Sequence, residues 1–279
     1  MGKKEVITQE RIKVPGIVEV TDPNELAEYE GVIGAGQSES VEDRGTPLLY
    51  VAQKQSPQCE ERDAKYIKDL KAGMAFNNLT GQMYDTEHDG MPFLPCYMRM
   101  VWSEWTPRDD GGGFHGEHHR SLNMESIGAK PFRRNEKSDP RRDIFVMPNG
   151  HELKLTAKYY GVIPMTWSPI IIPMASTSLG CSTKLQALIE SFKVMINGRI
   201  LPKPAYHNTY VLKTTYESND DGSWFQWAVG EVKPTGDKNL REFCRQFAIA
   251  CAKNEVKESK PLQEVASVRT APKDGDVPI

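Results

Sequence analysis

The sequence predicts a β-rich α+β domain, and three observations lead to this fold class. About seven short segments are rich in β-branched and aromatic residues or alternate apolar with polar residues, as strands do. Two further segments have helical spacing, one between strands and one that closes the domain. Clusters of Gly, Asn and Asp separate these segments, as turns require. Together they fit an elaborated OB-like, partly open β-barrel with two helices and disordered termini.

The chain divides into an arm, a domain and a tail. Residues 1–45 are rich in Gly and acidic residues and show little periodicity, so we expect a flexible N-terminal arm. Organised segments occupy residues 46–256, interrupted by a polar insertion at about 108–149 that opens with a run of glycines. Beyond Val256 the pattern fades, and we expect a disordered C-terminal tail at 257–279.

The first strands follow Pro47. Residues 48–52 predict a strand, and residues 74–84 predict a short hairpin that turns at Thr80-Gly81. The longest strand is predicted at 93–105, where alternation places Tyr97, Arg99 and Trp105 on one face and Trp102 on the other. Both faces therefore carry bulky side chains.

The second half of the domain alternates between strands and helices. Strands are predicted at 153–163 and 170–175, and a hairpin is predicted at 206–216 and 224–232 around the turn sequence 217–223. Apolar residues near helical spacing predict a helix at 178–195. A final amphipathic helix begins after Asp237, a good N-cap residue, and shares one stripe from Leu240 to Cys251.

Charge and cysteine content narrow the function classes. The formal net charge is −3, so nucleic-acid binding would have to depend on local charge, such as the basic run between Lys130 and Arg142. No stretch is long and apolar enough for a membrane span or a secretory signal, and we expect a cytoplasmic protein. Five cysteines without a C-x-x-C pair favour reduced thiols over a disulfide framework.

Several short motifs resemble a family of tailed-phage proteins. The likeness covers about residues 47–232 and rests on strings that include Trp105-Thr106-Pro107-Arg108-Asp109, Gly111-Gly112-Gly113-Phe114 and Gly222-Ser223-Trp224-Phe225. The resemblance implies a role in phage replication or recombination, where single-stranded-DNA-binding and annealing proteins are common.

The last residues resemble the protein-docking tip of bacterial single-stranded-DNA-binding proteins. That tip places acidic residues before Ile-Pro-Phe, and this chain ends with Ile where the family has Phe. The resemblance implies that replication or recombination proteins dock on the tail through Asp274, Asp276, Val277, Pro278 and Ile279.

Binding of a single strand requires aromatic faces for the bases and cations for the phosphates. The candidates for stacking are Tyr97, Trp102, Trp105, Phe114, Trp224 and Trp227. The candidates for phosphate contacts are Arg99, Arg108, Lys154, Lys158 and Lys213. Each aromatic residue taken singly is also an ordinary core residue of a β-rich domain. Trp105 and Phe114 flank the glycine run and are the stronger candidates for stacking.

Nucleotide binding, metal binding and hydrolytic catalysis have less support in the sequence. The glycine run lacks the context of a phosphate-binding loop, so we expect no nucleotide cofactor. His115, His118 and His119, with Glu117 between them, lack the H-E-x-x-H spacing, so we expect no metal. No nucleophile elbow occurs, and Asp109-Asp110 before glycine is ordinary turn chemistry. We therefore expect no enzyme.

The sequence thus predicts a phage-type single-stranded-DNA-binding protein that binds strands without sequence preference. Two alternatives stay open. One is a strand-annealing recombinase, which would form rings or filaments; the other is a non-enzymatic structural or interaction protein of a phage. Self-association, the length of strand covered and the identity of protein partners also stay open.

Overall fold

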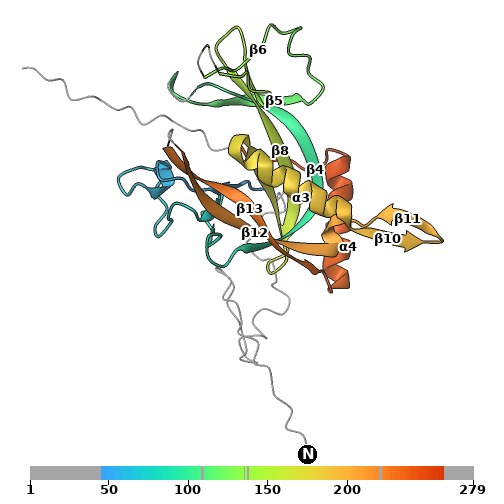
Figure 1. The fold of residues 1–279 in the computed structure, drawn as a ribbon. Helices are drawn as coiled ribbons and strands as arrows, with labels where there is room; N and C mark the ends of the chain where they lie inside the picture. The colour runs from blue at the N-terminus through green and yellow to red at the C-terminus, as the bar shows by residue number, and fades with distance from the viewer. Residues whose placement is uncertain (1–44, 108–109, 135, 137, 220–221, 261–279) are drawn as a thin grey trace, which may run out of the picture. The chain divides into compact units, whose positions relative to one another are not determined.

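The computed structural model describes residues 45–107, 110–134, 136, 138–219 and 222–260 (Figure 1). These residues belong to one compact unit, 44–279, and the fold below is the fold of that unit. The predicted N-terminal arm up to residue 44, Arg108 and the docking tip from Asp274 to Ile279 lie outside the described residues.

An eight-stranded sheet forms the centre of the unit, in the order β13-β12-β4-β8-β7-β6, with β5 added to β4 and β9 added to β8. Its strands are β4 (Met91–Trp105), β5 (Phe114–His119), β6 (Lys130–Pro131), β7 (Ile144–Val146), β8 (Glu152–Ile163), β9 (Ser168–Ala175), β12 (Asn208–Asn219) and β13 (Gly222–Pro234). The long ribbon of β4 and β8 runs antiparallel from Leu94 opposite Val162 to Trp105 opposite Glu152.

Two smaller sheets and the helices complete the described fold. The three-stranded sheet contains β1 (Leu49–Val51), β2 (Ala75–Asn77) and β3 (Met83–Tyr84), and a separate hairpin contains β10 (Lys193–Ile196) and β11 (Arg199–Pro202). The α-helices are α3 (Leu179–Ser191) and α4 (Lys238–Ala252), and the 3-10 helices are η1 (Pro57–Cys59), η3 (Ser176–Ser178) and η4 (Ala205–His207).

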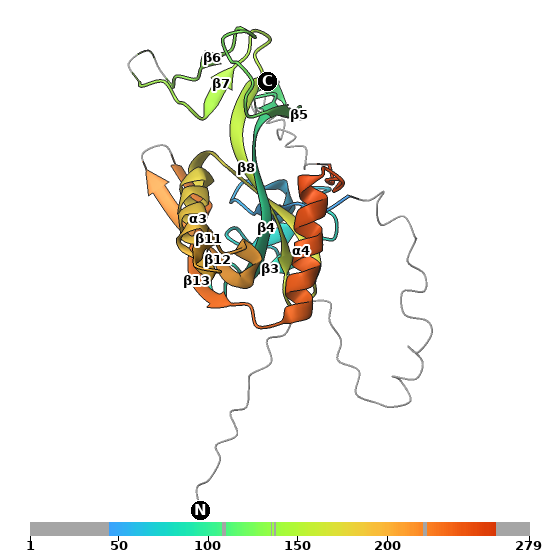
Figure 2. The same ribbon diagram turned by 90° about the vertical axis from the view of Figure 1, so that its right-hand side faces the viewer.

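The two α-helices lie on opposite sides of the β4–β8 ribbon (Figure 2). On one side, Leu94 and Val162 pack against Leu240 and Cys244 of α4. On the other side, the main core gathers buried residues of β4, β8, β9, β12 and β13 with Leu185 of α3. Asp237 caps α4 as predicted, because its carboxylate accepts hydrogen bonds from the backbone N–H groups of Asn239 and Leu240 at 2.8 and 3.1 Å.

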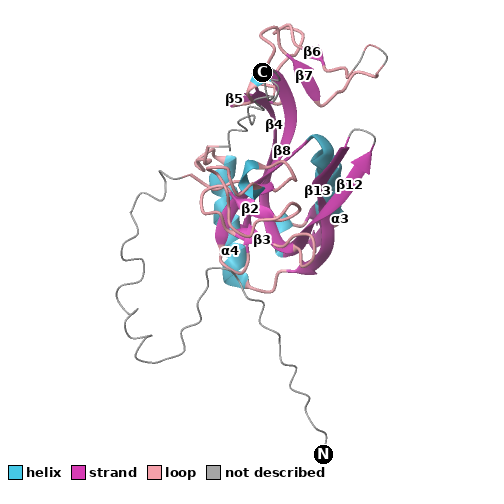
Figure 3. Ribbon diagram, turned by 90° about the vertical axis from the view of Figure 1, so that its left-hand side faces the viewer, coloured by secondary structure: helices cyan, strands magenta, loops and turns pink. Residues whose placement is uncertain are grey.

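The structure confirms the predicted fold class: a β-rich unit whose curled sheet forms a partly open barrel, with two α-helices among the described residues (Figure 3). Neither of these helices combines the length and the apolar composition needed to cross a membrane. All five cysteines are free thiols.

One predicted boundary is wrong. The helix predicted at 178–195 ends at Ser191, and the next residues form β10. Asn197 and Gly198 follow with φ values of 51° and 74°, the left-handed pair that a two-residue hairpin turn requires. The turn pairs β10 with β11 and thereby removes residues 193–195 from the helix.

Two further segments are more ordered than predicted. The polar insertion contains β5, β6 and β7, and three of its apolar residues, Leu122, Met124 and Ile127, pack against the cluster around Trp102. Residues 257–260, predicted as the start of the tail, lie against the domain: Glu258 bridges to Thr46, and Ser259 is 4% exposed.

Candidate nucleic-acid interface

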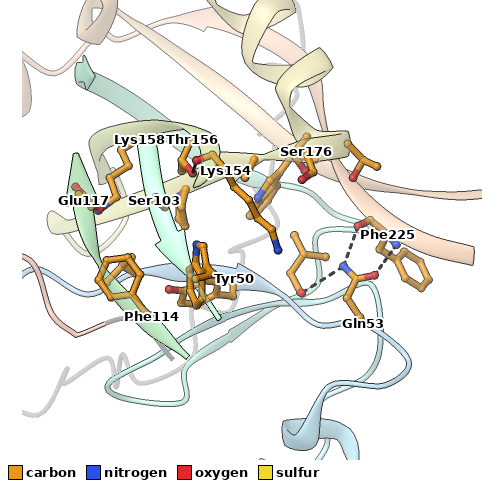
Figure 4. Close-up of a pocket in the computed structure, with 18 residues that line it drawn as sticks. Tyr50, Gln53, Ser103, Phe114, Glu117, Lys154, Thr156, Lys158, Ser176 and Phe225 are labelled. Atoms are coloured by element: carbon orange, nitrogen blue, oxygen red, sulfur yellow. Dashed lines mark hydrogen bonds and ion pairs between the residues drawn. The ribbon is translucent and has the colours of Figure 1, made fainter. Parts of the chain in front are cut away.

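A cleft with a volume of about 330 Å³ lies beside the β4–β8 ribbon (Figure 4). Residues from β1, β4, β5, β8, β9 and β13 form its walls, together with the 3-10 helix η3. Of the predicted site residues, the cleft brings together Trp105, Phe114, Lys154, Lys158 and Trp227. Segments that are distant in sequence therefore meet at one concave surface, as ligand sites commonly require.

Trp105 and Phe114 form an aromatic pair on the wall of the cleft. They lie directly opposite each other on β4 and β5, with ring centroids 5.0 Å apart and an interplanar angle of 58°. Both side chains are partly exposed. Gly113, directly before β5, has a φ of 139°, which suits glycine. The pair thus offers ring surface to a molecule in the cleft.

Lys154 supplies a partly exposed cation to the same cleft. It lies on β8 opposite Ser103, and alternation along β8 places it on the same face as Thr156 and Lys158. Its amine contacts Glu152 at 2.9 Å, and 29% of its side chain is exposed. Figure 4 shows the amine extending into the cleft. Because an ion pair with a partly exposed cation is weaker than a buried one, Lys154 can exchange Glu152 for an anionic ligand.

Lys158 and Arg99 are held in a buried ionic network. The Lys158 side chain is 4% exposed and forms ion pairs with Glu117 and Glu258. Arg99 pairs with the same two carboxylates, with 3.3 Å to Glu117. Tyr160 donates its hydroxyl hydrogen bond to Glu258. Two cations and two carboxylates therefore balance each other within the domain.

The network shifts the pKa values of its members, among them Glu258 and Tyr160. Burial by itself would raise the pKa of the Glu258 carboxyl, but the charge of Lys158 and the hydrogen bonds outweigh burial and lower it below its ordinary value. Burial and the nearby Glu258 carboxylate raise the pKa of Tyr160. Glu258 is thus ionised at neutral pH and holds the C-terminal segment 257–260 against the sheet.

Of the remaining predicted residues, Trp227 touches the cleft from the core, and the others described do not line it. Tyr97 packs edge-on against Tyr160 with ring centroids 5.8 Å apart. Trp102 is 2% exposed, and its Nε1 donates to the carbonyl of Arg120 at 3.3 Å. Trp227 touches the cleft but is 3% exposed and belongs to the main core. Trp224 on β13 and Lys213 on β12 are partly exposed and do not line the cleft.

Sequence reasoning missed Tyr50, Gln53 and Phe225, which also line the cleft. Gln53 accepts from the backbone N–H of Phe225 and donates to its carbonyl, both at 2.8 Å. This pair of bonds joins segments 172 residues apart in sequence. Only the aromatic character of Tyr50 and Phe225 could have marked them, and nothing in their local pattern indicates a shared site.

A histidine cluster lies around Glu104 at the end of β4. Glu104 contacts His118 Nε2 at 2.7 Å and His151 Nδ1 at 2.6 Å, and the ring of His115 stacks on His151 with centroids 4.0 Å apart. Of the histidines noted in sequence, His119 is absent from this cluster, because it hydrogen-bonds Ser121 at 2.7 Å. Across the described residues, no group of three His, Cys, Asp or Glu side chains has an arrangement that could hold a metal ion.

The structure describes part of the basic run between Lys130 and Arg142. Arg133 donates to the carbonyl of Ser138 at 2.9 Å, and Arg141 pairs with Asp143. Neither residue lines the cleft. The described residues of this basic run therefore do not line the cleft.

Comparison with known proteins places the chain among phage proteins. A family model described as Pam3 phage gp34-like protein matches residues 19–257, which include every described α-helix and strand. No curated protein and no solved structure matches the chain.

Proposed function

The chain belongs to the Pam3 phage gp34-like protein family, and from this premise we propose that it binds single-stranded DNA during phage replication or recombination. The protein has no enzymatic activity in this proposal and acts in the cytoplasm of the host cell. It contacts the strand without sequence preference, through base stacking and phosphate contacts. The family match supports the phage setting, and the cleft supports the binding.

The observation that carries the proposal is the convergence of Trp105, Phe114 and Lys154 at one cleft. Stacking of a base on an aromatic side chain contributes about 1 to 3 kcal/mol and tolerates any base, because every base has a flat face. Lys154 lies where a phosphate next to a stacked base would meet a positive charge.

The ionic network limits the number of cations in the cleft that can contact phosphates. Glu117 and Glu258 balance the charges of Arg99 and Lys158. These two cations therefore contribute less to phosphate binding than their positions on the predicted strands suggested. Stacking then carries a larger share of the affinity than phosphate contacts. The logarithm of affinity falls by about 0.7 per logarithm of salt for each phosphate contact with a single strand. A protein with few free cations in its cleft therefore has a modest salt dependence.

The direct test is the fluorescence anisotropy of labelled oligothymidine, measured at several salt concentrations with the full chain. Binding should weaken as salt rises, and Trp105→Ala with Phe114→Ala should weaken it at least about tenfold. Lys154→Ala should reduce the salt slope by about 0.7. The matched control is Trp167→Ala, because Trp167 is a 39%-exposed tryptophan that packs on Phe243 and does not line the cleft.

Two outcomes would count against the proposal. The absence of binding at low salt removes the function altogether. Equal losses from the Trp167 control and the cleft variants would place binding elsewhere on the chain.

The tail forms a separate part of the proposal. Deletion of Asp274–Ile279 should leave the affinity for oligothymidine unchanged while it abolishes capture of a replication or recombination protein. A partner that still binds the truncated chain would remove the docking role of the tip.

A protein-interaction role is the second candidate function. It is favoured by the exposed apolar side chains of the β10–β11 hairpin, where Met195 is 72% and Ile200 is 68% exposed. The two functions are compatible, because the hairpin residues do not line the cleft.

A further inference from the structure

The β10–β11 hairpin projects from the body of the unit (Figure 1). It carries large apolar side chains that are exposed to solvent. Met195 is 72% exposed, Ile200 is 68% exposed, Ile196 is 51% exposed and Leu201 is 42% exposed. They are four of the eight large apolar residues with this degree of exposure among the described residues. A cluster of this kind on a single short element is typical of an interaction surface.

The hairpin has a defined register, so its apolar side chains have defined positions. Met195 lies opposite Ile200, and Val194 lies opposite Leu201. Because side chains alternate along a strand, these pairs lie on opposite faces of the hairpin. The Asn197-Gly198 turn fixes the register through two left-handed residues. Both faces of the arm are therefore apolar, which suits insertion between two walls.

An apolar groove lies elsewhere on the same unit. It has a volume of about 450 Å³ and lies between α3 and the β4–β8 ribbon. Its apolar lining includes Met98, Met100, Leu155, Leu179 and Ala187. Its volume falls within the range of pockets that hold a ligand, about 300 to 1,000 Å³. The groove can therefore accept two or three apolar side chains.

The charges of hairpin and groove are complementary. The segment 193–203 contains Lys193, Arg199 and Lys203 and no acidic residue. Among the described residues that line the groove, Glu190 is the charged one. Face-to-face contact of two hairpins would bring like charges together, whereas contact of a hairpin with the groove brings opposite charges together.

We propose that the β10–β11 hairpin of one copy of the chain inserts into the α3 groove of a second copy. The contact is head-to-tail, because the two partners use different surfaces. Such a contact builds a ring if the rotation between copies closes and a filament if it does not. Ile200 and Met195 enter the groove, and Arg199 or Lys193 meets Glu190 at its rim.

The test is light scattering after size-exclusion chromatography of the full chain over a range of protein concentrations. The wild-type chain should self-associate, and Ile200→Glu in the hairpin should raise the dissociation constant at least about tenfold. Ala187→Arg, which fills the groove from an exposed helical position, should have the same effect. The control is Leu79→Glu, at another exposed apolar residue in the turn between β2 and β3. Unchanged circular dichroism shows that each variant folds.

A mixing experiment separates this contact from a symmetric one. The Ile200→Glu chain keeps its groove and the Ala187→Arg chain keeps its hairpin, so their mixture should form dimers that grow no further. Charge reversal gives a second check: Glu190→Arg and Arg199→Glu each weaken association, and combining both in one chain restores it.

Three results would overturn the proposal. The first is a wild-type chain that stays monomeric at about 100 μM, well above the micromolar range of weak specific contacts. The second is association that is lost with Ile200→Glu but kept with Ala187→Arg, which would indicate a hairpin–hairpin contact. The third is a mixture of the two variants that contains no dimer.

Discussion

The two halves of the β4–β8 ribbon serve different purposes although they belong to one ladder. The inner half, from Leu94 opposite Val162 to Met98 opposite Tyr159, is covered on both faces, by α4 on one side and by the main core on the other. In the cleft half, from Arg99 opposite Lys158 to Trp105 opposite Glu152, one face carries the ionic network and then borders the cleft, and the other face is covered by the insertion. There the insertion places Leu122, Met124 and Ile127 around Trp102.

This difference shows how one strand pair can supply both stability and a binding surface. Where both faces are covered, β4 and β8 carry apolar side chains such as Leu94 and Tyr159. Where one face borders the cleft, the same alternation presents Trp105 and Lys154 to it. The buried ionic network lies at the junction of the two halves. The comparison predicts that substitutions cost much stability up to that junction and little at the cleft-lining side chains beyond it.

The largest effect on the free energy of unfolding is expected at the junction itself. Lys158→Met keeps the length of the side chain but removes the ion pairs of Lys158 with Glu117 and Glu258, while Arg99 still contacts both carboxylates. Loss of one partner from a buried ion pair costs about 3 to 5 kcal/mol. Urea unfolding should therefore show a large fall in the free energy of unfolding. Lys154→Met, which removes a partly exposed ion pair in the cleft half, should cost less than about 1 kcal/mol. Similar costs for the two variants would contradict the comparison.

The second effect tests the packing of the inner half. A Cβ atom at Gly161 would lie 2.3 Å from the ring of Phe93 and 2.4 Å from the carbonyl oxygen of Leu94. Gly161→Ala should therefore cost about 1 to 3 kcal/mol, because the core cannot move both groups freely. The control is Gly180→Ala in α3, where the new Cβ meets no atom within 4 Å. It should stabilise the fold by about 0.5 kcal/mol. Thermal unfolding of both variants measures the difference, and a tolerated Gly161→Ala would show that the ribbon is less tightly packed.

A third and smaller effect concerns the helix that covers the inner half. Asp237→Ala removes the two hydrogen bonds that cap α4 and should cost about 1 kcal/mol. Asp237→Asn keeps an acceptor at the same position and should recover most of the loss. Urea unfolding can resolve this difference, and equal losses for both variants would assign the effect to the charge of Asp237 instead of the cap.

Much of the fold could be predicted because its main signals are local. Alternation and turn residues located the long β4 strand and the β12–β13 hairpin, and the stripe after Asp237 located α4. The predicted end of α3 is wrong because the apolar residues of β10 continue the helical spacing of α3. The Asn197-Gly198 pair was the signal that could have corrected it.

The site could be predicted only in part, because its members come from distant segments. Trp105 and Phe114 flank one short loop, so their proximity follows from the sequence. The position of Gln53 against Phe225 depends on the packing of β1 against β13, which no local pattern encodes. Likewise, the sequence predicts Lys158 only as a cation on a strand. Its partner Glu258 lies 100 residues away in the sequence, so no local pattern indicates the ion pair.

The smallest effect is expected at the far end of the cleft half, where Glu104 contacts His118 and His151. Burial alone would raise the pKa of the Glu104 carboxyl, but the hydrogen bonds from the two histidines lower it below its ordinary value. A carboxyl with a lowered pKa in the folded state adds stability above its unfolded pKa and loses it as the pH falls through the folded value. Glu104→Gln should therefore cost less than about 1 kcal/mol at pH 7 and should flatten the loss of stability below about pH 4.5. Thermal unfolding of both proteins from pH 7 to pH 3 measures this. If the variant loses stability below about pH 4.5 as steeply as the wild type, other carboxylates cause the acid sensitivity. Glu258 in the buried network is the strongest candidate among them.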